Sequence, residues 1–240
     1  MTDTNGLHAR SILVKLQTPP LMSNEHGFAD GREVHRWFPD FFGYQSRRPA
    51  LTLDDIRGSA MAGVKSWTTH RSVHVLQDRW ISVRADYCST PNGVAVAPYY
   101  ILEFPDFVHV FATDAADRVI LVRQYRHGLQ GLSLELPGGV MDLHDTDAVA
   151  VGARELQEET GYSGGTLAHL ATLSVDPARY ANRLHLIRAT CVIAGLSDPE
   201  PTEDIEVVLV SRQEAKRLAL SGGISNAGHA GLMLISLATP

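Results

Sequence analysis

The feature that most constrains the fold of this chain is a short charged helix that follows a glycine-containing turn. Residues 154–162 read Arg-Glu-Leu-Gln-Glu-Glu-Thr-Gly-Tyr, and residues 136–139 read Leu-Pro-Gly-Gly. Because positions i, i+3 and i+4 are neighbours on an α-helix, Glu155, Glu158 and Glu159 are expected on one side of it. Like charges at this spacing repel by about 0.2–0.5 kcal/mol per pair. A hard divalent cation would remove that repulsion, so the segment predicts a metal-holding helix.

Local signals at both ends support this helix. Asp147 is a residue type that caps a helix start, and Gly161 suits the left-handed position after a helix end. Arg154 lies four residues before Glu158, so its side chain can orient that carboxylate. The competing hypothesis is that the glutamates only form a solvated helix face, the common role of a charged patch.

The length and composition are those of a globular protein. A chain of 240 residues accommodates one domain with an extension, or two small domains. The formal net charge of −6 argues against general binding to nucleic acid. No run approaches the roughly 18 apolar residues of a membrane span, and the first residues lack the order of a signal peptide. The two cysteines, Cys88 and Cys191, have no metal or redox spacing, so we expect a reduced, cytoplasmic protein that does not bind membranes.

The chain is expected to divide at about residue 65. Residues 1–65 carry scattered prolines and glycines without a sustained strand or helix period, so we assign them to an N-terminal extension, partly disordered and without an assigned function. Residues 66–240 are expected to form the main domain. Its predicted strands are 80–88, 94–104, 107–113, 119–126, 166–173, 184–193 and 205–210, and its predicted helices begin after Asp147, after Ser211 and at Asn226. This order predicts the α+β class, with a curved mixed sheet between helices.

The whole pattern from residue 136 to residue 162 resembles the Nudix box, the signature of the Nudix hydrolases. Residues 119–127, 134–139 and 201–207 are similar to the ADP-ribose pyrophosphatase branch of that superfamily, and Pro177 stands where that branch commonly has a proline. The resemblance covers roughly residues 70–235. It implies a Nudix α/β/α sandwich for the domain 66–240.

The resemblance also implies an activity and its requirements. The expected reaction is hydrolysis of ADP-ribose, or of a similar nucleoside diphosphate sugar, to a nucleoside monophosphate and a sugar phosphate. Splitting a pyrophosphate needs phosphate charge neutralised and a water deprotonated, which Mg²⁺ and a carboxylate supply together; Mn²⁺ is the alternative metal. The branch commonly forms homodimers whose N-terminal strands cross over to complete the partner's site, so a homodimer is expected.

Site roles carry over residue by residue. Gly138 is included because a glycine lets the backbone approach closely, so that its carbonyl can face a metal. Glu203 matches an acidic residue of a late loop that is proposed as general base in relatives. The predicted residues are Glu158, Glu203 and Arg154 for catalysis; Arg126, Arg123 and Glu135 for substrate binding; and Glu155, Glu159, Glu158 and Gly138 for the metal.

One departure from the family pattern leaves alternatives open. Thr146 stands where the box has its first glutamate, and the interval from Gly139 to Arg154 is one residue longer than usual. A catalytically silent Nudix domain that binds a nucleotide sugar is therefore an alternative to the enzyme. The three retained glutamates argue against it. A further alternative keeps the hydrolysis but changes the substrate to GDP-mannose or a dinucleotide, since spacing does not identify the base or the sugar.

Overall fold

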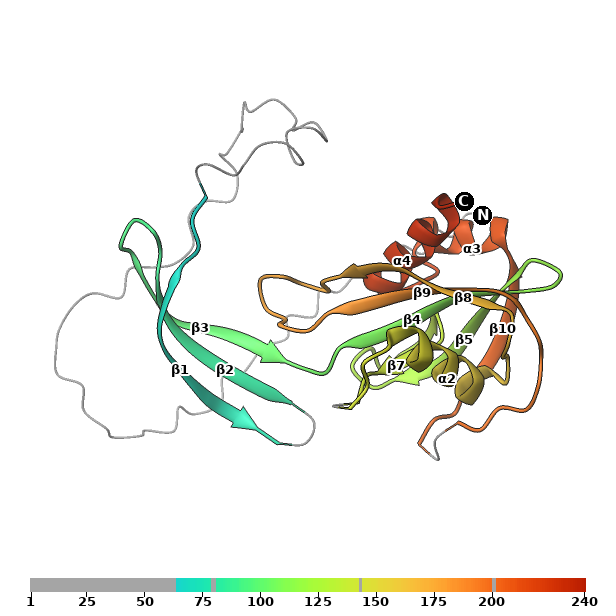
Figure 1. The fold of residues 1–240 in the computed structure, drawn as a ribbon, viewed down its shortest axis with the longest axis horizontal. Helices are drawn as coiled ribbons and strands as arrows, with labels where there is room; N and C mark the ends of the chain where they lie inside the picture. The colour runs from blue at the N-terminus through green and yellow to red at the C-terminus, as the bar shows by residue number, and fades with distance from the viewer. Residues whose placement is uncertain (1–63, 79–80, 143, 200–201) are drawn as a thin grey trace, which may run out of the picture. The chain divides into compact units, whose positions relative to one another are not determined.

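The computed structural model describes residues 64–78, 81–142, 144–199 and 202–240 (Figure 1). The extension predicted for residues 1–65 therefore lies outside the described residues, except for Val64 and Lys65. The first three strands form an antiparallel sheet in the order β1-β2-β3. They are β1 (Thr68–Gln77), β2 (Ser82–Ser89) and β3 (Ala95–Glu103).

A second, seven-stranded sheet follows. Its path runs β10-β5-β4-β9-β8, with β6 paired to β5 and β7 paired to β4. The β4–β9 pair is parallel and the other pairs are antiparallel, so the sheet is mixed. Its strands are β4 (Phe107–Asp114), β5 (Arg118–Arg126), β6 (Gly131–Glu135), β7 (Gly138–Val140), β8 (Thr166–Leu173), β9 (Leu184–Val192) and β10 (Glu206–Ser211); the helices are α2 (Ala148–Thr160), α3 (Arg212–Ser221) and α4 (Ala227–Ala238).

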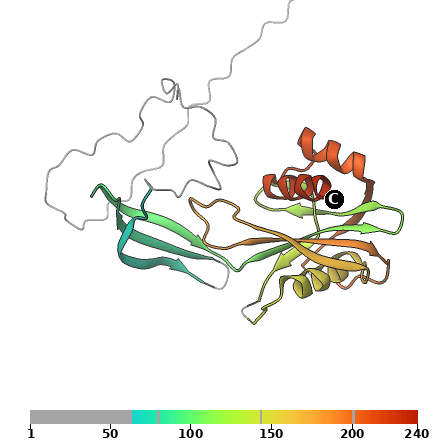
Figure 2. The same ribbon diagram turned by 45° about the horizontal axis from the view of Figure 1, so that its top comes forward.

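The helices lie on both faces of the mixed sheet, α2 on one and α3 and α4 on the other (Figure 2). Alternation along β4 explains the two layers, because successive side chains of a strand point to opposite faces. Val108 and Val110 pack in a core with Leu156 of α2, whereas Phe111 packs in a second core with Met233 of α4. The predicted α+β class, with a mixed sheet between helices, is confirmed.

The ends of α2 follow the local signals in the sequence. The Asp147 carboxylate accepts a hydrogen bond from the Val149 N–H at 2.8 Å, and Gly161 adopts the left-handed conformation with φ 74°. Gly152 lets the helix approach the sheet, because a Cβ there would lie only 3.0 Å from Ile187. The buried side chains Val151 and Leu156 thus fix the helix against the sheet and leave its glutamates on another side.

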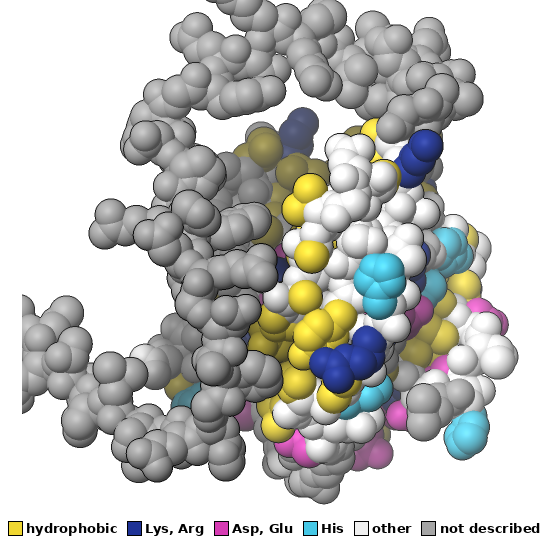
Figure 3. Space-filling model, turned by 90° about the vertical axis from the view of Figure 1, so that its left-hand side faces the viewer, with side chains coloured by type: hydrophobic (Ala, Val, Ile, Leu, Met, Phe, Trp, Pro, Cys, Tyr) yellow, Lys and Arg dark blue, Asp and Glu magenta, His cyan; other side chains and the backbone are white. Residues whose placement is uncertain are grey.

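The sequence did not predict β1, β6 or β7. All ten residues of β1 are exposed, so its side chains lack the alternation of a half-buried strand. Figure 3, which views the molecule from the side of the three-stranded sheet, shows hydrophobic side chains at the surface; Val73 and Val75 of β1 are 40% and 56% exposed. The strand β7 begins inside the predicted glycine turn. Among the described residues, none of the helices has the length and apolar character that crossing a membrane requires.

Candidate active site

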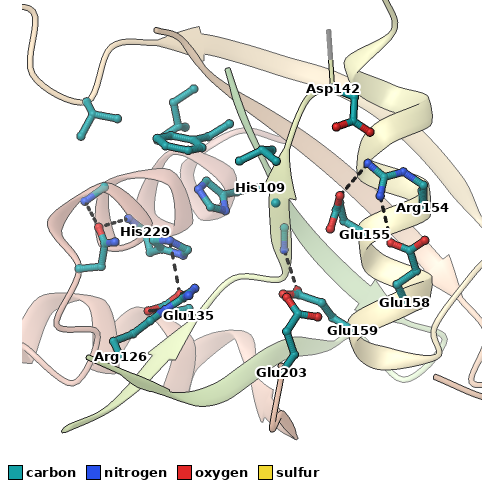
Figure 4. A pocket seen from close by; sticks show the side chains of 18 residues that line it. His109, Arg126, Glu135, Asp142, Arg154, Glu155, Glu158, Glu159, Glu203 and His229 are labelled. Carbon is teal, nitrogen blue, oxygen red and sulfur yellow. Dashed lines mark hydrogen bonds and ion pairs between the residues drawn. The ribbon is translucent and has the colours of Figure 1, made fainter. Parts of the chain in front are cut away.

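A pocket of about 550 Å³ lies where α2, the β4–β7 pair and the start of α4 contribute side chains (Figure 4). Its volume is in the range of small-molecule sites, roughly 300–1,000 Å³. The site residues predicted from the sequence, apart from Arg123, line it: Arg126, Glu135, Gly138, Arg154, Glu155, Glu158, Glu159 and Glu203.

Glu159 is the most deeply placed carboxylate of α2. It is 4% exposed, and its Oε2 accepts a hydrogen bond from the Gly138 N–H at 2.8 Å. Burial raises the pKa of Glu159 to about 8, against the opposing effect of the Gly138 hydrogen bond and with the help of the Glu203 and Glu155 charges. Figure 4 shows the Glu203 side chain beside Glu159. The groups around Glu159 therefore do not offset the cost of ionising this carboxylate in its buried position.

Arg154 connects the other two glutamates of the helix. Its guanidinium lies 2.8 Å from Glu155 Oε1 and 3.1 Å from Glu158 Oε2. The Glu155 side chain is 14% exposed and that of Glu158 is 42% exposed. Burial raises the pKa of Glu155 despite the nearby Arg154 charge. Arg154 thus fixes the orientation of both carboxylates at the mouth of the pocket.

The donor set fits a divalent cation. Within the described residues no group of three or more His, Cys, Asp or Glu side chains is already arranged around a metal position. Glu155 and Glu159 nevertheless supply carboxylate oxygens, the ligands that hard divalent cations prefer, and a cation would relieve the cost of charging both. The absence of a side chain at Gly139 leaves space for the Glu155 carboxylate, because a Cβ at residue 139 would lie 2.6 Å from the Glu155 carboxyl carbon.

Gly138 also has a conformation that requires glycine. Its φ is 153°, and a Cβ would overlap the Val108 carbonyl oxygen and lie 2.8 Å from the His109 ring. The same residue pairs with His109 across the β4–β7 ladder. The bare glycine therefore lets β7 pass close to β4 while its N–H reaches Glu159.

A second group of polar side chains lies around Glu135. Arg126 binds this carboxylate through two nitrogens, with Nη2 at 2.6 Å and Nε at 3.1 Å. Burial acts to raise the pKa of Glu135, but hydrogen bonds from Arg126 and Ser133 outweigh it and hold the pKa below its ordinary value. On the other side, His229 accepts a hydrogen bond from the Leu136 N–H at Nδ1, and its Nε2 is 3.9 Å from Glu135.

Sequence reasoning missed His109 and His229. Their ring centroids are 4.2 Å apart, and both rings line the pocket. The signal for His109 was a polar residue in the apolar strand Phe-Val-His-Val-Phe, on the face shared with Phe107 and Phe111. His229 sits in an apolar helix and gave no comparable signal.

Arg123 lies elsewhere. Its Nη1 donates to Glu206 Oε2 at 2.9 Å on the neighbouring strand β10, and it does not line the pocket. Arg123 and Arg126 are three residues apart, and side chains at an odd separation point to opposite faces of a strand. The two arginines are therefore not presented to the same site. A role for Arg123 in substrate binding stays a prediction.

The lengthened loop before α2 brings another acid to the pocket. Asp142 lines the pocket, and its N–H donates to Asp145 Oδ2 at 2.8 Å. Asp145 in turn lies 4.0 Å from Arg154. Asp142 and Asp145 therefore add carboxylates near Arg154, in the region where the family box has its first glutamate.

Comparison with models of known protein families gives two matches. A model described as the nucleoside diphosphate sugar hydrolase N-terminal domain matches residues 67–102, which span the three-stranded sheet. A NUDIX domain model matches residues 104–226. The chain belongs to the Nudix family. It is thus an enzyme of a family that acts on small nucleotide substrates and generally uses divalent metals.

Three individual relatives of this Nudix chain share between 20% and 27% sequence identity with it. A methanol dehydrogenase activator of Bacillus methanolicus is 27% identical over 146 residues, which are 59% of this chain and 78% of the relative. An ADP-ribose pyrophosphatase of Bacillus subtilis (strain 168) is 25% identical over 155 residues, 64% of this chain and 83% of the relative. The crystal structure of an ADP compounds hydrolase is similar with a TM-score of 0.65 at 20% identity, and the match covers 72% of this chain and 94% of that chain. This likeness shows the Nudix fold.

Proposed function

We propose that this Nudix enzyme is a Mg²⁺-dependent pyrophosphatase of nucleoside diphosphate sugars, with ADP-ribose as the leading substrate and AMP and ribose 5-phosphate as products. The observation that carries the proposal is that Glu155, Glu159 and Arg126 line the same pocket. The N-terminal model named for nucleoside diphosphate sugar hydrolases and the Bacillus subtilis ADP-ribose pyrophosphatase support this substrate class.

Glu155 and Glu159 would hold the Mg²⁺, with Glu158 and the Gly138 carbonyl as further ligands and Mn²⁺ as the alternative metal. When bound, the metal neutralises charge on the diphosphate oxygens and makes the phosphorus more electrophilic. Arg154 already binds Glu155 and Glu158, so it orients the carboxylates that this chemistry needs.

Arg126 suits a substrate phosphate. Glu135 engages its Nε and Nη2, which fixes the guanidinium plane and leaves the Nη1 hydrogens for an anion. This arrangement accounts for both residues in one site: Glu135 positions, and Arg126 binds.

Glu203 is the proposed general base. It lies in the segment before β10, lines the pocket and is close enough to Glu159 to raise the pKa of that residue. In the proposed step its carboxylate takes a proton from water, the water oxygen bonds to one phosphorus, and the bridging oxygen leaves with the other phosphate. The products are then AMP and ribose 5-phosphate.

We also propose a cytoplasmic homodimer. Support comes from the exposed edge strand β1, which pairs with β2 and carries exposed apolar side chains such as Val75. An edge strand of this kind is a template for pairing with a second chain.

The deciding experiment is product analysis by chromatography of ADP-ribose incubated with the protein and Mg²⁺. Wild type, Glu159→Gln and Glu214→Gln are compared, since Glu214 is a glutamate of α3 outside the pocket. AMP and ribose 5-phosphate from wild type and Glu214→Gln, but not from Glu159→Gln, would establish the reaction and its centre.

Failure on ADP-ribose would lead to ADP-glucose, GDP-mannose and diadenosine polyphosphates under the same conditions. Turnover of one of these would retain the pyrophosphatase and change its substrate. Thermal stabilisation by a nucleotide sugar with no product from any of them would overturn the proposal in favour of the silent binding domain.

A further inference from the structure

The two histidines face a part of the pocket that the proposed reaction does not yet use. Figure 4 shows His109 and His229 on the opposite side of the pocket from Arg154 and Glu155. Apolar side chains of Phe107, Val175 and Leu184 line the same pocket. The side chains of Phe107, Val175 and Leu184 have no oxygen or nitrogen that could bind a divalent cation.

Hydrogen bonding assigns the proton on each imidazole. Nδ1 of His229 accepts from the Leu136 N–H, so the proton of this ring is on Nε2, which points toward Glu135 at 3.9 Å. Nδ1 of His109 is buried and has no hydrogen-bond partner among the described residues, because it lies against Gly138. A buried donor without an acceptor is costly, so the favoured tautomer of His109 carries its proton on Nε2.

The two rings therefore differ in what they can do. His229 is held by the Leu136 N–H, its Nε2 lies 3.9 Å from Glu135, and its ring contacts that of His109. His109 is left with one N–H, on Nε2, for which the described part of the chain supplies no acceptor. A ligand that enters this side of the pocket is the remaining acceptor.

The charges of this region favour an uncharged ligand group. Arg126 neutralises Glu135 through two hydrogen bonds. Nδ1 of His229 accepts a hydrogen bond, and Nδ1 of His109 is buried without an acceptor among the residues that the structure describes, so neither atom carries a proton and each ring is uncharged. A neutral N–H beside apolar side chains suits a hydroxyl group better than a second phosphate, which needs cationic partners.

We propose that His109 is a specificity-determining residue whose Nε2–H donates to a hydroxyl of the sugar on the distal phosphate, with His229 as the positioning residue behind it. The proposal rests on the proposed function and deepens it, since it defines the ligand group beyond the pyrophosphate as an uncharged polyol. Ligands that lack this group lose the contact.

The test compares ADP-ribose with ADP, which has the same base and the same two phosphates but no distal sugar. The KM for ADP-ribose and the inhibition constant of ADP are measured for three variants. His109→Phe keeps a ring without a donor, His109→Asn places an amide near Nδ1, and His109→Gln places one near Nε2. His169→Phe is the control, because His169 is an exposed histidine of β8 outside the pocket.

The expected result is a KM for ADP-ribose that rises about three- to tenfold in His109→Phe and His109→Asn, the effect of one neutral hydrogen bond. The inhibition constant of ADP stays within about twofold, and His109→Gln and His169→Phe resemble wild type. Parallel increases of both constants in His109→Phe, or a His109→Gln variant as defective as His109→Phe, would overturn the proposal.

The subsite can be tested even if wild type hydrolyses no nucleoside diphosphate sugar. Titration calorimetry then gives dissociation constants for ADP-ribose and ADP in the same variants. Tighter binding of ADP-ribose than of ADP, lost in His109→Phe and retained in His109→Gln, supports the subsite although the proposed reaction has failed. Equal affinities of wild type for the two ligands would refute it.

Discussion

At the scale of single residues, Glu159 shows that the site disfavours ionisation of one of its own carboxyl groups. Burial raises its pKa to about 8, whereas an unfolded glutamate titrates near about 4.3. A raised pKa of the folded state contributes stability that is complete below the unfolded value and lost as the pH rises through the folded value. Metal-free wild type is therefore expected to lose roughly 2–4 kcal/mol of unfolding free energy from this group between pH 5 and pH 9.

The measurement is urea denaturation in EDTA at pH 5, 7 and 9. Glu159→Gln should remove this loss and exceed wild type in stability at pH 9. Glu214→Gln, an exposed substitution on α3, should follow the pH dependence of wild type. Added Mg²⁺ at pH 8 should stabilise wild type more than Glu159→Gln, because a cation that binds only the folded state shifts the equilibrium toward it. Parallel pH profiles of wild type and Glu159→Gln would contradict the prediction.

Gly138 offers a second test at this scale. An alanine Cβ would overlap the Val108 carbonyl and crowd the His109 ring, so β7 would have to move away from β4. We expect Gly138→Ala to lower the unfolding free energy by about 2–4 kcal/mol and to reduce turnover, since its N–H holds Glu159. Gly128→Ala is the matched control, because its Cβ would meet nothing within 4 Å. Equal stabilities of the two variants in denaturant titrations would show that the predicted crowding is absent.

At the scale of secondary-structure elements, two helical glycines separate packing from helix propensity. Gly231 of α4 is exposed and an alanine Cβ there would meet nothing within 4 Å, whereas at Gly152 of α2 it would lie 3.0 Å from Ile187. Alanine favours a helix over glycine by about 0.8–1.0 kcal/mol. We expect Gly231→Ala to gain most of this free energy, and the crowding at Gly152→Ala to cancel it. Thermal denaturation of both variants checks this, and an equal gain at the two positions would count against close contact of α2 with the sheet.

At the scale of the whole molecule, the sequence predicted what local spacing determines. The cap at Asp147, the stop at Gly161 and the carboxylates between them lie within one segment, and the structure has that helix with those ends. His109 and His229 come together only when β4 packs against α4, so no local pattern indicated that the two rings meet. The short strands β6 and β7 are defined by pairing with β5 and β4 and not by their own residues.

The three-stranded sheet leads to the last prediction. β1 is an edge strand, and its residues Val73 and Val75 are 40% and 56% exposed. If the proposed homodimer forms through this sheet, charges at these positions would be buried without partners at the interface. We expect Val73→Glu/Val75→Glu to weaken dimerisation at least about tenfold in sedimentation velocity. The control is Leu220→Glu, since Leu220 of α3 is 67% exposed and lies outside this sheet.

Circular dichroism separates loss of association from loss of folding. The doubly substituted variant is expected to keep the signal of the helices and of the mixed sheet, because β1 is not part of that sheet. A folded monomer in Val73→Glu/Val75→Glu, with a dimer in wild type and Leu220→Glu, would place the interface on the three-stranded sheet. Wild type that sediments as a monomer at every concentration would refute the homodimer. A charged variant that dimerises as wild type does would instead keep the dimer and move its interface away from β1.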